Sequence, residues 1–479
     1  MAQPDMSDGI ENGGGREMRR RHWIILAILA VVEIASALYL AWLNPVQGYD
    51  ENWYLISSHR IAGATALPYA HHRPPVFPIL LALFGDYNRL VPGIAHIGSA
   101  ALTFIILRRL VTLRLAISGV VVFMASYQLR TYNVLLLTEM TTIFLLLLAT
   151  YCFLVHRPFL LGVVATLLVM THWSMATVGL VVSAVYIMRC RWRPCGMFVA
   201  GASLAATPFL IVSAAAYGNP LAPALANFAV QSGGTNDWWF YVREFPLLSL
   251  PLIIGGLAAG GWVIANRRNW RNLPWYDFCV LLLGIIVARV MLLHVVGPKG
   301  VRFLVPLIPM LLLLTLLMLR HYGQGIPRLQ WAALAILLIS VLPDRQWVYY
   351  IHDLARNPVK QIADLKDTLA TFASDQAVYT DLNDLAVMGR TGHPAVAVTG
   401  PGSWHHQLYN RPACTRGEIP EGVLYLTWDP GPLEVIAAAS PARHRPLSLV
   451  RWRTGGQPHA GASVLSSTAA TSEAESTPH

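Results

Sequence analysis

The sequence predicts a mainly α-helical membrane protein, a polytopic transmembrane bundle of about eleven spans, followed by a small C-terminal α/β domain. Hydrophobic residues make up 55% of the chain and charged residues only 13%, and the mean hydropathy is +0.49. Apolar runs near the length of about 20 residues that a bilayer requires recur from Trp23 to Pro343. These runs are too many for a signal peptide or a single anchor. After Pro343 the hydropathy changes to that of a water-soluble domain.

The predicted spans follow the apolar runs in chain order. Residues 1–22 form a cytoplasmic tail that we expect to be disordered, because a glycine run precedes a basic anchor. The transmembrane domain takes in residues 23–343, with long outer loops at 44–89 and 218–247, and a helix lying on the membrane surface is expected over residues 54–62. The spans themselves are predicted at residues 23–43, 90–108, 113–129, 133–155, 158–171, 173–188, 195–217, 248–265, 275–296, 302–319 and 330–343.

Basic side chains indicate how the bundle is oriented. With the N-terminus in the cytoplasm, 16 Lys and Arg side chains fall on the inner side and seven in outer loops before residue 344. This asymmetry follows the positive-inside rule. It places the loops around Asp50 and Lys299, and the whole C-terminal segment, outside the cytoplasm. We therefore expect a multi-pass protein of a bacterial inner or plasma membrane.

The formal net charge of +10 does not indicate a nucleic-acid partner. Residues 344–479 carry 11 basic and 13 acidic side chains, so the positive excess lies in the membrane domain. Anionic lipid headgroups explain that excess better than nucleic acid does, and membrane lipid is an expected partner. The five cysteines do not form a disulfide framework. Cys190 and Cys195 have no second pair that would complete a zinc site.

The C-terminal segment alternates helical and strand-like patterns, which predicts one extracytoplasmic α/β domain over residues 344–453. The tail at 454–479 is rich in Gly, Ala, Ser and Thr and is expected to be disordered. Within the domain, helices are predicted at 352–373, 382–389 and 432–439, and strands at 377–380, 395–398, 423–427 and 447–452.

Ionisable residues gather in the predicted outer loops. Asp50 and Glu51 follow the first span, Arg73 precedes two prolines, and Lys299 and Arg302 precede the tenth span. A carboxylate can take a proton from a hydroxyl group, and arginine and lysine can hold a phosphate, so the set suits chemistry on a lipid-borne phosphate. Each residue also has a plain structural interpretation, as a loop carboxylate, a carboxylate partner or an interfacial anchor.

Nucleotide-binding signatures are missing from the sequence. No dinucleotide glycine fingerprint, P-loop or Ser-His-Asp elbow stands in a fitting strand–turn–helix context. This argues against an ATP-driven or nucleotide-sugar enzyme.

Four short motifs stand in a recognisable order along the membrane domain. They are Gly48-Tyr49-Asp50-Glu51-Asn52-Trp53-Tyr54, His72-Arg73-Pro74-Pro75, Leu137-Thr138-Glu139-Met140 and Lys299-Gly300-Val301-Arg302-Phe303-Leu304-Val305-Pro306-Leu307-Ile308-Pro309. In their order and topological placement they resemble the PMT/ArnT-like branch of the GT-C glycosyltransferases. The resemblance covers residues 20 to about 343.

The resemblance implies an inverting glycosyltransferase that moves a sugar from a polyprenyl-phosphate donor to a glycan, lipid or protein of the cell envelope. Asp50 would be the general base, and Glu51 would orient the acceptor or a water. The substrate-binding residues would be Tyr54, His72, Arg73, Lys299 and Arg302.

No cofactor is required for this chemistry, because the lipid-linked donor is already activated. A divalent metal is compatible with the site, and nothing in the sequence requires one. The chain departs from the aminoarabinose transferases of this branch at Trp53, where they have arginine, and at His72, where they have glutamate. These departures leave the sugar open and weaken the case for a metal site.

Two other functions stay open. A transporter or flippase of a lipid-linked or anionic solute would use the same cations for binding alone, and inverted repeats with broken helices would favour it. No convincing internal repeat is visible. An inactive scaffold for envelope assembly is the other alternative, although the acidic pair that an inactive relative would be expected to lose is present.

Three ionisable residues lie inside predicted spans and need partners. Glu139 and Arg289 fall at similar depths below the outer ends of their spans, which predicts that they form an ion pair or line the donor cavity together. Glu33 is in the first span, and the sequence shows no partner for it.

Overall fold

The computed structural model describes residues 27–36, 49–63, 73–231, 249–268, 275–295, 301–323 and 327–341, a few single residues beside them, and short segments between 366 and 451. The chain divides into two compact units. One unit contains residues 1–63 and 68–357, and the other contains residues 64–67 and 358–479.

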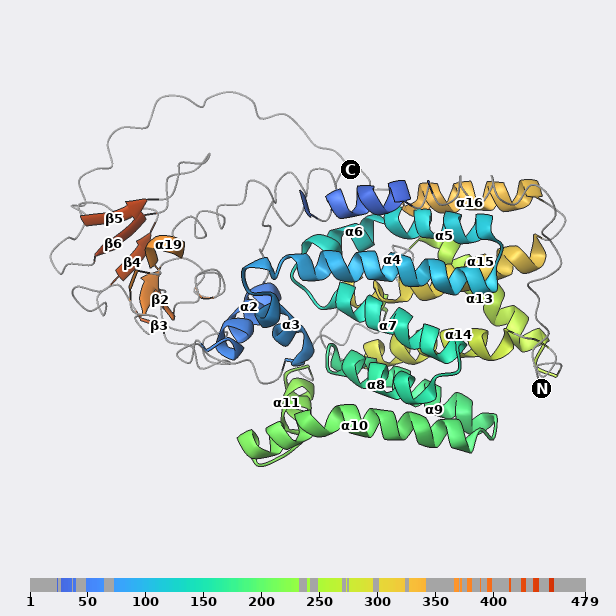
Figure 1. Cartoon of the computed structure of the whole chain (residues 1–479), viewed down its shortest axis with the longest axis horizontal. Coiled ribbons are helices and arrows are strands. Elements are labelled where there is room, and N and C mark those ends of the chain that lie inside the picture. Colours follow the sequence, from blue (N-terminus) through green and yellow to red (C-terminus); the bar gives the residue numbers. More distant parts are fainter. Residues whose placement is uncertain are drawn as a thin grey trace, which may run out of the picture. The chain divides into compact units, whose positions relative to one another are not determined.

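Helices make up the described part of the first unit (Figure 1), and most of them are apolar. In chain order they are the helix Ala27–Ser36, α2 Tyr49–Ile61, α3 Val76–Phe84, α4 Leu90–Leu110, α5 Leu113–Ala125, α6 Tyr127–Val134, α7 Glu139–Leu154, α8 Pro158–Val169, α9 Ala176–Met188, α10 Trp192–Tyr217, α11 Ala222–Gln231, α13 Leu250–Ala265, α14 Tyr276–Val295, α15 Leu307–Tyr322 and α16 Pro327–Val341, with short 3-10 turns η1 Gly85–Tyr87, η2 Trp173–Met175 and η5 Val301–Leu304.

Three of these helices, α4, α10 and α14, are long and apolar enough to cross a bilayer by themselves. The shorter apolar helices are 10–17 residues long when α3 is counted with η1 and α9 with η2. The predicted count of about eleven spans is therefore not decided by helix length and stays a prediction.

Two predicted spans are not continuous helices. The span predicted at 133–155 is wrong in its first part, because α6 ends at Val134 and α7 begins only at Glu139. The span predicted at 302–319 begins with the 3-10 turn η5, and α15 starts at Leu307. Both interruptions lie beside charged residues of the candidate site. Pro306, the N-cap of α15, is a sequence signal for the second interruption, whereas the apolar pattern contains none for the first.

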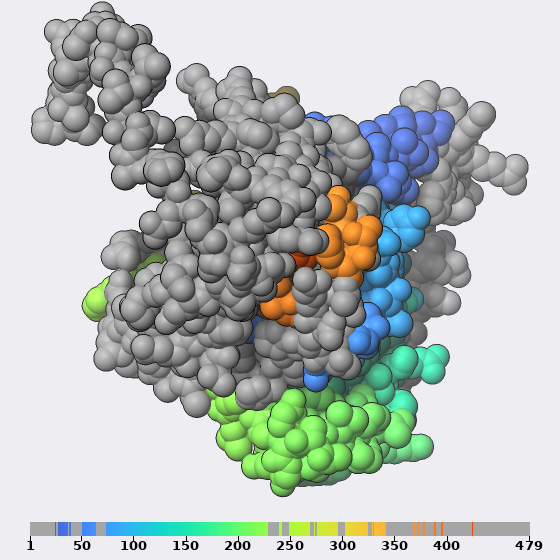
Figure 2. Space-filling view, turned by 90° about the vertical axis from the view of Figure 1, so that its left-hand side faces the viewer, coloured from blue at the N-terminus to red at the C-terminus, as the bar shows by residue number. Residues whose placement is uncertain are grey.

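The centre of the unit is α15, whose residues from Leu307 to Met318 are all buried. A helix that is apolar on every side buries all of its faces, so it belongs inside a bundle. Helix α15 packs against α13, α5, α14 and α4. By contrast, α10 exposes apolar side chains such as Leu204, Ile211 and Val212, and its surface with α11 is visible in green in Figure 2. Such a face suits contact with lipid.

Helices α8 and α10 pack with their backbones almost touching. A side chain at Gly162 would place its Cβ 2.0 Å from the carbonyl oxygen of Phe198, and one at Gly201 would lie 2.1 Å from that of Phe159. Thr166 Oγ1 also donates a hydrogen bond of 3.2 Å to the carbonyl of Ala202. Small residues permit this approach, which drives helix association where apolar burial cannot. The two helices are therefore packed backbone to backbone.

Glu33, for which the sequence shows no partner, is held by two other helices. Its Oε2 accepts a 2.8 Å hydrogen bond from Arg130 of α6, and its Oε1 lies 3.1 Å from His96 Nε2 of α4. Arg130 also donates to Ser36 on the same helix as Glu33, at 2.7 Å. Glu33 and His96 are almost completely buried. The cluster therefore ties the first apolar helix to the bundle.

Replacing Glu33 by glutamine should destabilise the protein by about 3 kcal/mol, because Arg130 loses its buried counter-charge. Thermal unfolding in detergent would measure the change. In an Arg130→Gln background the same substitution should cost much less, since the pair is already broken. Equal costs in the two backgrounds would contradict the ion-pair interpretation.

The described strands form a six-stranded sheet in the second unit, in the order β3-β2-β1-β4-β6-β5 (Figure 1). β1 pairs in parallel with β2 and β4, and β2 with β3, whereas β6 is antiparallel to β4 and β5. The strands are β1 Val378–Thr380, β2 Ala395–Val398, β3 Ala413–Cys414, β4 Leu424–Thr427, β5 Glu434–Ala438 and β6 Ser448–Arg451.

The four predicted strands are present as β1, β2, β4 and β6. The helix predicted at 432–439 is wrong, because Glu434–Ala438 forms β5 and pairs with β6. Strand pairing there overrides the helix propensity of the segment. Only α19, Lys366–Leu369, is described within the helix predicted at 352–373. The α/β assignment and the domain boundaries therefore stay predictions.

Candidate functional site

Helix α2 carries the acidic pair in its first turn. It begins at Tyr49, so Asp50 and Glu51 lie where the helix dipole favours negative charge. The helix predicted over residues 54–62 is present, although its first residue differs, and its position on the membrane surface stays a prediction. The helix starts earlier, and residues 51–58 are all buried, since α2 packs against α3 and the segment before α7.

Two arginines hold the carboxylate of Asp50. Arg73 donates a hydrogen bond to Oδ1 and Arg302 donates one to Oδ2, so each oxygen has its own cation. The side chains of Asp50 and Arg73 are 16% and 18% exposed, and that of Arg302 is 33% exposed. Arg302 is 252 positions from Asp50 in the chain. The tertiary structure thus joins three residues that the sequence places in separate loops.

The two cations decide the protonation state of Asp50. Burial by itself raises the pKa of this carboxyl group, but the charges of Arg73 and Arg302 outweigh burial and hold the pKa at about 2. Asp50 is therefore ionised at neutral pH. While both arginines remain paired with it, it is also a weak proton acceptor.

Arg73 is positioned by the prolines that follow it and by an aromatic ring. Pro74 restricts the backbone of Arg73 to an extended conformation, and α3 starts directly after Pro75. The guanidinium lies 5.5 Å from the ring centroid of Tyr54, a cation–π contact. Tyr54 itself packs edge-on against Phe77, with centroids 5.1 Å apart. Tyr54 therefore supports Arg73 from α2.

Glu51 has a different partner from Asp50. Its Oε1 accepts a 2.9 Å hydrogen bond from the backbone N–H of Leu136, in the break between α6 and α7. A helix would have used that N–H internally. Glu51 is buried. This contact ties the start of α2 to the start of α7 and so fixes the position of Asp50.

The predicted ion pair between Glu139 and Arg289 is not formed. Glu139 Oε1 lies 3.9 Å from Arg302 Nε, whereas Arg289 donates to Ser174 Oγ at 2.7 Å and to the carbonyl of Phe303 at 3.0 Å. Both residues are buried and contact the same short segment, Arg302-Phe303. Within the described residues, Glu139 Oε2 and Arg289 Nη2 have no hydrogen-bond partner. Buried polar atoms without partners are expected where a ligand binds.

The sequence pattern did not single out Ser174. It donates to or accepts from His172 Nδ1 at 2.8 Å and accepts from Arg289, and His172 packs edge-on against Phe303. The polar residues His172 and Ser174 between two apolar runs were a usable signal for this position. They extend the polar cluster towards Arg289.

Two predicted site residues, His72 and Lys299, lie outside the described residues, so their relation to Asp50 stays a prediction. Among the residues that the structure does describe, no three His, Cys, Asp or Glu side chains are grouped as metal ligands would be.

Comparison with solved structures relates this geometry to known proteins. The crystal structure of ArnT from Cupriavidus metallidurans bound to undecaprenyl phosphate matches with a TM-score of 0.59 and 12% identity, over 88% of this chain and 97% of that one. The apo structure of the same ArnT matches with a TM-score of 0.58 and 13% identity, over 88% and 98%. This chain has a GT-C-like fold.

The GT-C-like fold confirms the resemblance drawn from the four motifs. Together with the apolar helices, it identifies an integral membrane protein. No family model matches the chain, and no curated protein matches it in sequence. The similarity is therefore one of structure and not of sequence.

Proposed function

We propose that this protein is an inverting glycosyltransferase that moves a sugar from a polyprenyl-phosphate donor to a glycan, lipid or protein acceptor at the outer face of the membrane. The observation that supports it best is the pairing of Asp50 with Arg73 and Arg302. A base and two phosphate-binding cations are then within one cluster. The similar ArnT crystal structure has undecaprenyl phosphate bound, and this lipid belongs to the polyprenyl-phosphate class proposed here for the donor.

The arginine cluster suggests how donor binding would activate the base. The donor phosphate competes with Asp50 for Arg73 and Arg302, because both are oxyanions that accept paired guanidinium hydrogen bonds. Once the arginines turn towards the phosphate, the pKa of Asp50 rises from about 2, since burial raises it when the charges no longer oppose burial. Asp50 then becomes a better proton acceptor only when the donor is in place.

The residues of this cluster can account for both the proton transfer and the exchange of bonds at the sugar. Asp50 takes the proton of the acceptor hydroxyl, and the hydroxyl oxygen forms a bond to the anomeric carbon. The bond between that carbon and the phosphate oxygen breaks, and the phosphate leaves with the electron pair. Arg73 and Arg302 stabilise the charge that develops on the phosphate. Attack from the face opposite the leaving group inverts the anomeric centre.

Other residues have supporting roles in this proposal. Glu51 is a positioning residue, because it holds α2 against Leu136. Tyr54 orients Arg73 through its ring. His72 and Lys299 would add polar contacts to the donor. The reaction requires no cofactor, and a divalent metal remains compatible with it.

The proposal includes the membrane arrangement. The apolar helices would form about eleven spans in a bacterial inner or plasma membrane. The N-terminus would be cytoplasmic, and the second unit would lie outside as an α/β domain.

The decisive experiment is transfer of radiolabelled sugar by the purified protein in membrane lipid. A panel of polyprenyl-phosphate sugars would be offered with envelope glycan, lipid and protein acceptors. Label that moves to an acceptor supports the transferase and identifies the donor. Donor binding or translocation without transfer to any acceptor would instead favour the transporter, and binding without either would favour the scaffold.

The pH dependence of transfer should separate the free protein from its donor complex. In the free protein, protonation of Asp50 removes the base only as pH falls towards about 2, so kcat/KM should show no acidic limb from Asp50 above pH 4. In the complex the pKa of Asp50 is raised, so kcat should fall at a higher pH than kcat/KM does. Steady-state rates between pH 4 and 9 would measure both profiles. Coincident acidic limbs would contradict activation by the donor.

A further inference from the structure

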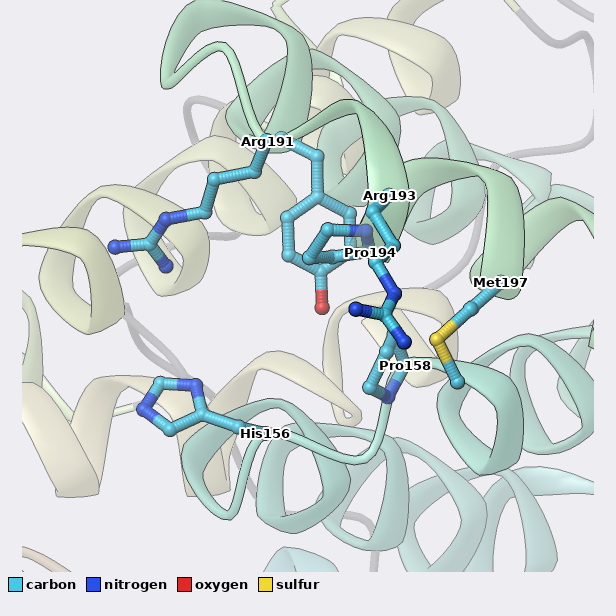
Figure 3. Close-up of a pocket in the computed structure, with 7 residues that line it drawn as sticks. His156, Pro158, Arg191, Arg193, Pro194 and Met197 are labelled. Atoms are coloured by element: carbon cyan, nitrogen blue, oxygen red, sulfur yellow. The ribbon is translucent and has the colours of Figure 1, made fainter.

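A cavity of about 260 Å³ lies where helices α7 and α9 end and helices α8 and α10 begin, away from Asp50. Its lining includes His156, Pro158, Tyr186, Arg191, Arg193 and Pro194, which come from the α7–α8 and α9–α10 connections and the adjoining helix ends (Figure 3). Helix α7 starts at Glu139 in the candidate site and runs for roughly 22 Å before this end is reached. The cavity is therefore separate from the arginine cluster.

The electrostatic character of the cavity is positive. No acidic residue lines it. Arg191 lies 3.2 Å from Asp277, but the other oxygen of that carboxylate lies 2.6 Å from Arg189, so one negative charge serves two arginines. Arg193 has no ion pair within the described part of the chain. The cavity thus offers uncompensated positive charge.

Two helices begin at this cavity. Helix α8 starts at Pro158 and α10 at Trp192, and neither has an acidic residue in its first turn or a side-chain cap. Backbone N–H groups at such ends are free to bind an anion, and the helix dipoles favour negative charge. The close contacts at Gly162 and Gly201 hold the two helices together. Both ends are therefore fixed beside one another.

Tyr186 supplies an independent sign of a ligand. Its side chain lines the cavity, is only 4% exposed and stacks on Phe153, with ring centroids 5.8 Å apart. Within the described residues its hydroxyl group makes no hydrogen bond. The hydroxyl oxygen is not among the buried atoms that lack a partner, so it opens into the cavity although the ring around it is buried. A ligand in the cavity can therefore accept a hydrogen bond from this O–H.

We propose that this cavity binds a phosphate group, either in the headgroup of an anionic lipid or as a soluble phosphate. Arg193 and Arg191 would pair with the phosphate oxygens, Tyr186 would donate its O–H, and the starts of α8 and α10 would face the negative charge. In the predicted orientation this end meets the cytoplasmic leaflet, and Trp192 is 64% exposed beside it, as interfacial tryptophans are. The proposal does not depend on sugar transfer.

Native mass spectrometry of the full-length protein in detergent would test it. The protein would be titrated with phosphatidylglycerol and, separately, with neutral phosphatidylcholine. A parallel thermal-unfolding titration would use inorganic phosphate. Arg193→Gln should weaken phosphatidylglycerol or phosphate binding by about tenfold, and Tyr186→Phe by about threefold, as expected for charged and neutral hydrogen bonds.

Arg268→Gln is the matched control. Arg268 is an exposed arginine just after α13, at the same end of the bundle, and does not line the cavity. Its substitution should leave binding unchanged. Binding of phosphatidylglycerol that depends on Arg193 would identify a lipid headgroup, and binding of inorganic phosphate alone would identify a soluble ligand. Equal losses for Arg193→Gln and Arg268→Gln, or no preference for any phosphate anion over phosphatidylcholine, would overturn the proposal.

Discussion

Asp50→Asn should lower kcat for sugar transfer about a thousandfold, within the range that removal of a general base produces. The amide has nearly the same shape as the carboxylate but cannot accept the proton of the acceptor hydroxyl. Transfer rates measured with saturating donor and acceptor in membrane lipid would give the change directly.

The same substitution should leave donor binding intact or make it tighter. Asp50 competes with the donor phosphate for Arg73 and Arg302, and asparagine competes less because it has no charge. Donor affinity would be measured by equilibrium binding of a labelled polyprenyl-phosphate sugar. Loss of kcat with unchanged or improved affinity separates a catalytic role from a structural one.

Asp86→Asn serves as the control for charge removal in the same loop region. Asp86 is an exposed residue of the turn η1 and is not among the residues around Asp50. Its variant should keep normal activity. If Asp50→Asn retained transfer within a few-fold of wild type while folding normally, Asp50 would not be the base.

Arg302→Gln should reduce kcat/KM for the donor about a hundredfold, because a hydrogen bond from a charged donor to phosphate is lost in both the complex and the transition state. A second consequence follows from its other partner. Arg302 is the cation 3.9 Å from the buried Glu139, so its removal should also lower stability. Donor binding, transfer and thermal unfolding would be measured on the same preparations.

Arg302→Lys distinguishes these two effects. Lysine keeps the positive charge near Glu139 and should restore most of the stability, but it lacks the planar fork that binds two oxygens at once. Transfer should therefore recover only in part. If the lysine variant regained full stability and the glutamine variant kept normal donor affinity, Arg302 would have a purely structural role.

Much of the helical bundle was predictable because lipid imposes a simple requirement on sequence. Helices α4, α10 and α14 lie close to predicted spans, since about 20 consecutive apolar residues are needed wherever a single helix crosses a bilayer. The outer-loop positions of Asp50, Arg73 and Arg302 could also be proposed, because charged residues are costly inside the bilayer. Four strands of the second unit, β1, β2, β4 and β6, were also predictable, because their segments have a strand-like residue pattern.

The predictions of secondary structure fail where a contact with a distant part of the chain decides the local structure. The break before Glu139 releases the N–H of Leu136, and Glu51 from another helix accepts its hydrogen bond. β5 forms because β6 pairs with it, although its residues fit a helix. Neither partner can be identified from the segment itself.

The sequence by itself determined that this is an apolar helical protein with a small set of outward-facing ionisable residues, because composition and periodicity report how each segment meets lipid or water. Only the tertiary structure decided which of those residues meet. Asp50 joins Arg73 and Arg302, while Glu33 joins Arg130 and His96. Such pairs depend on how helices pack, and the energy of each pair depends on burial and distance, which local sequence does not encode.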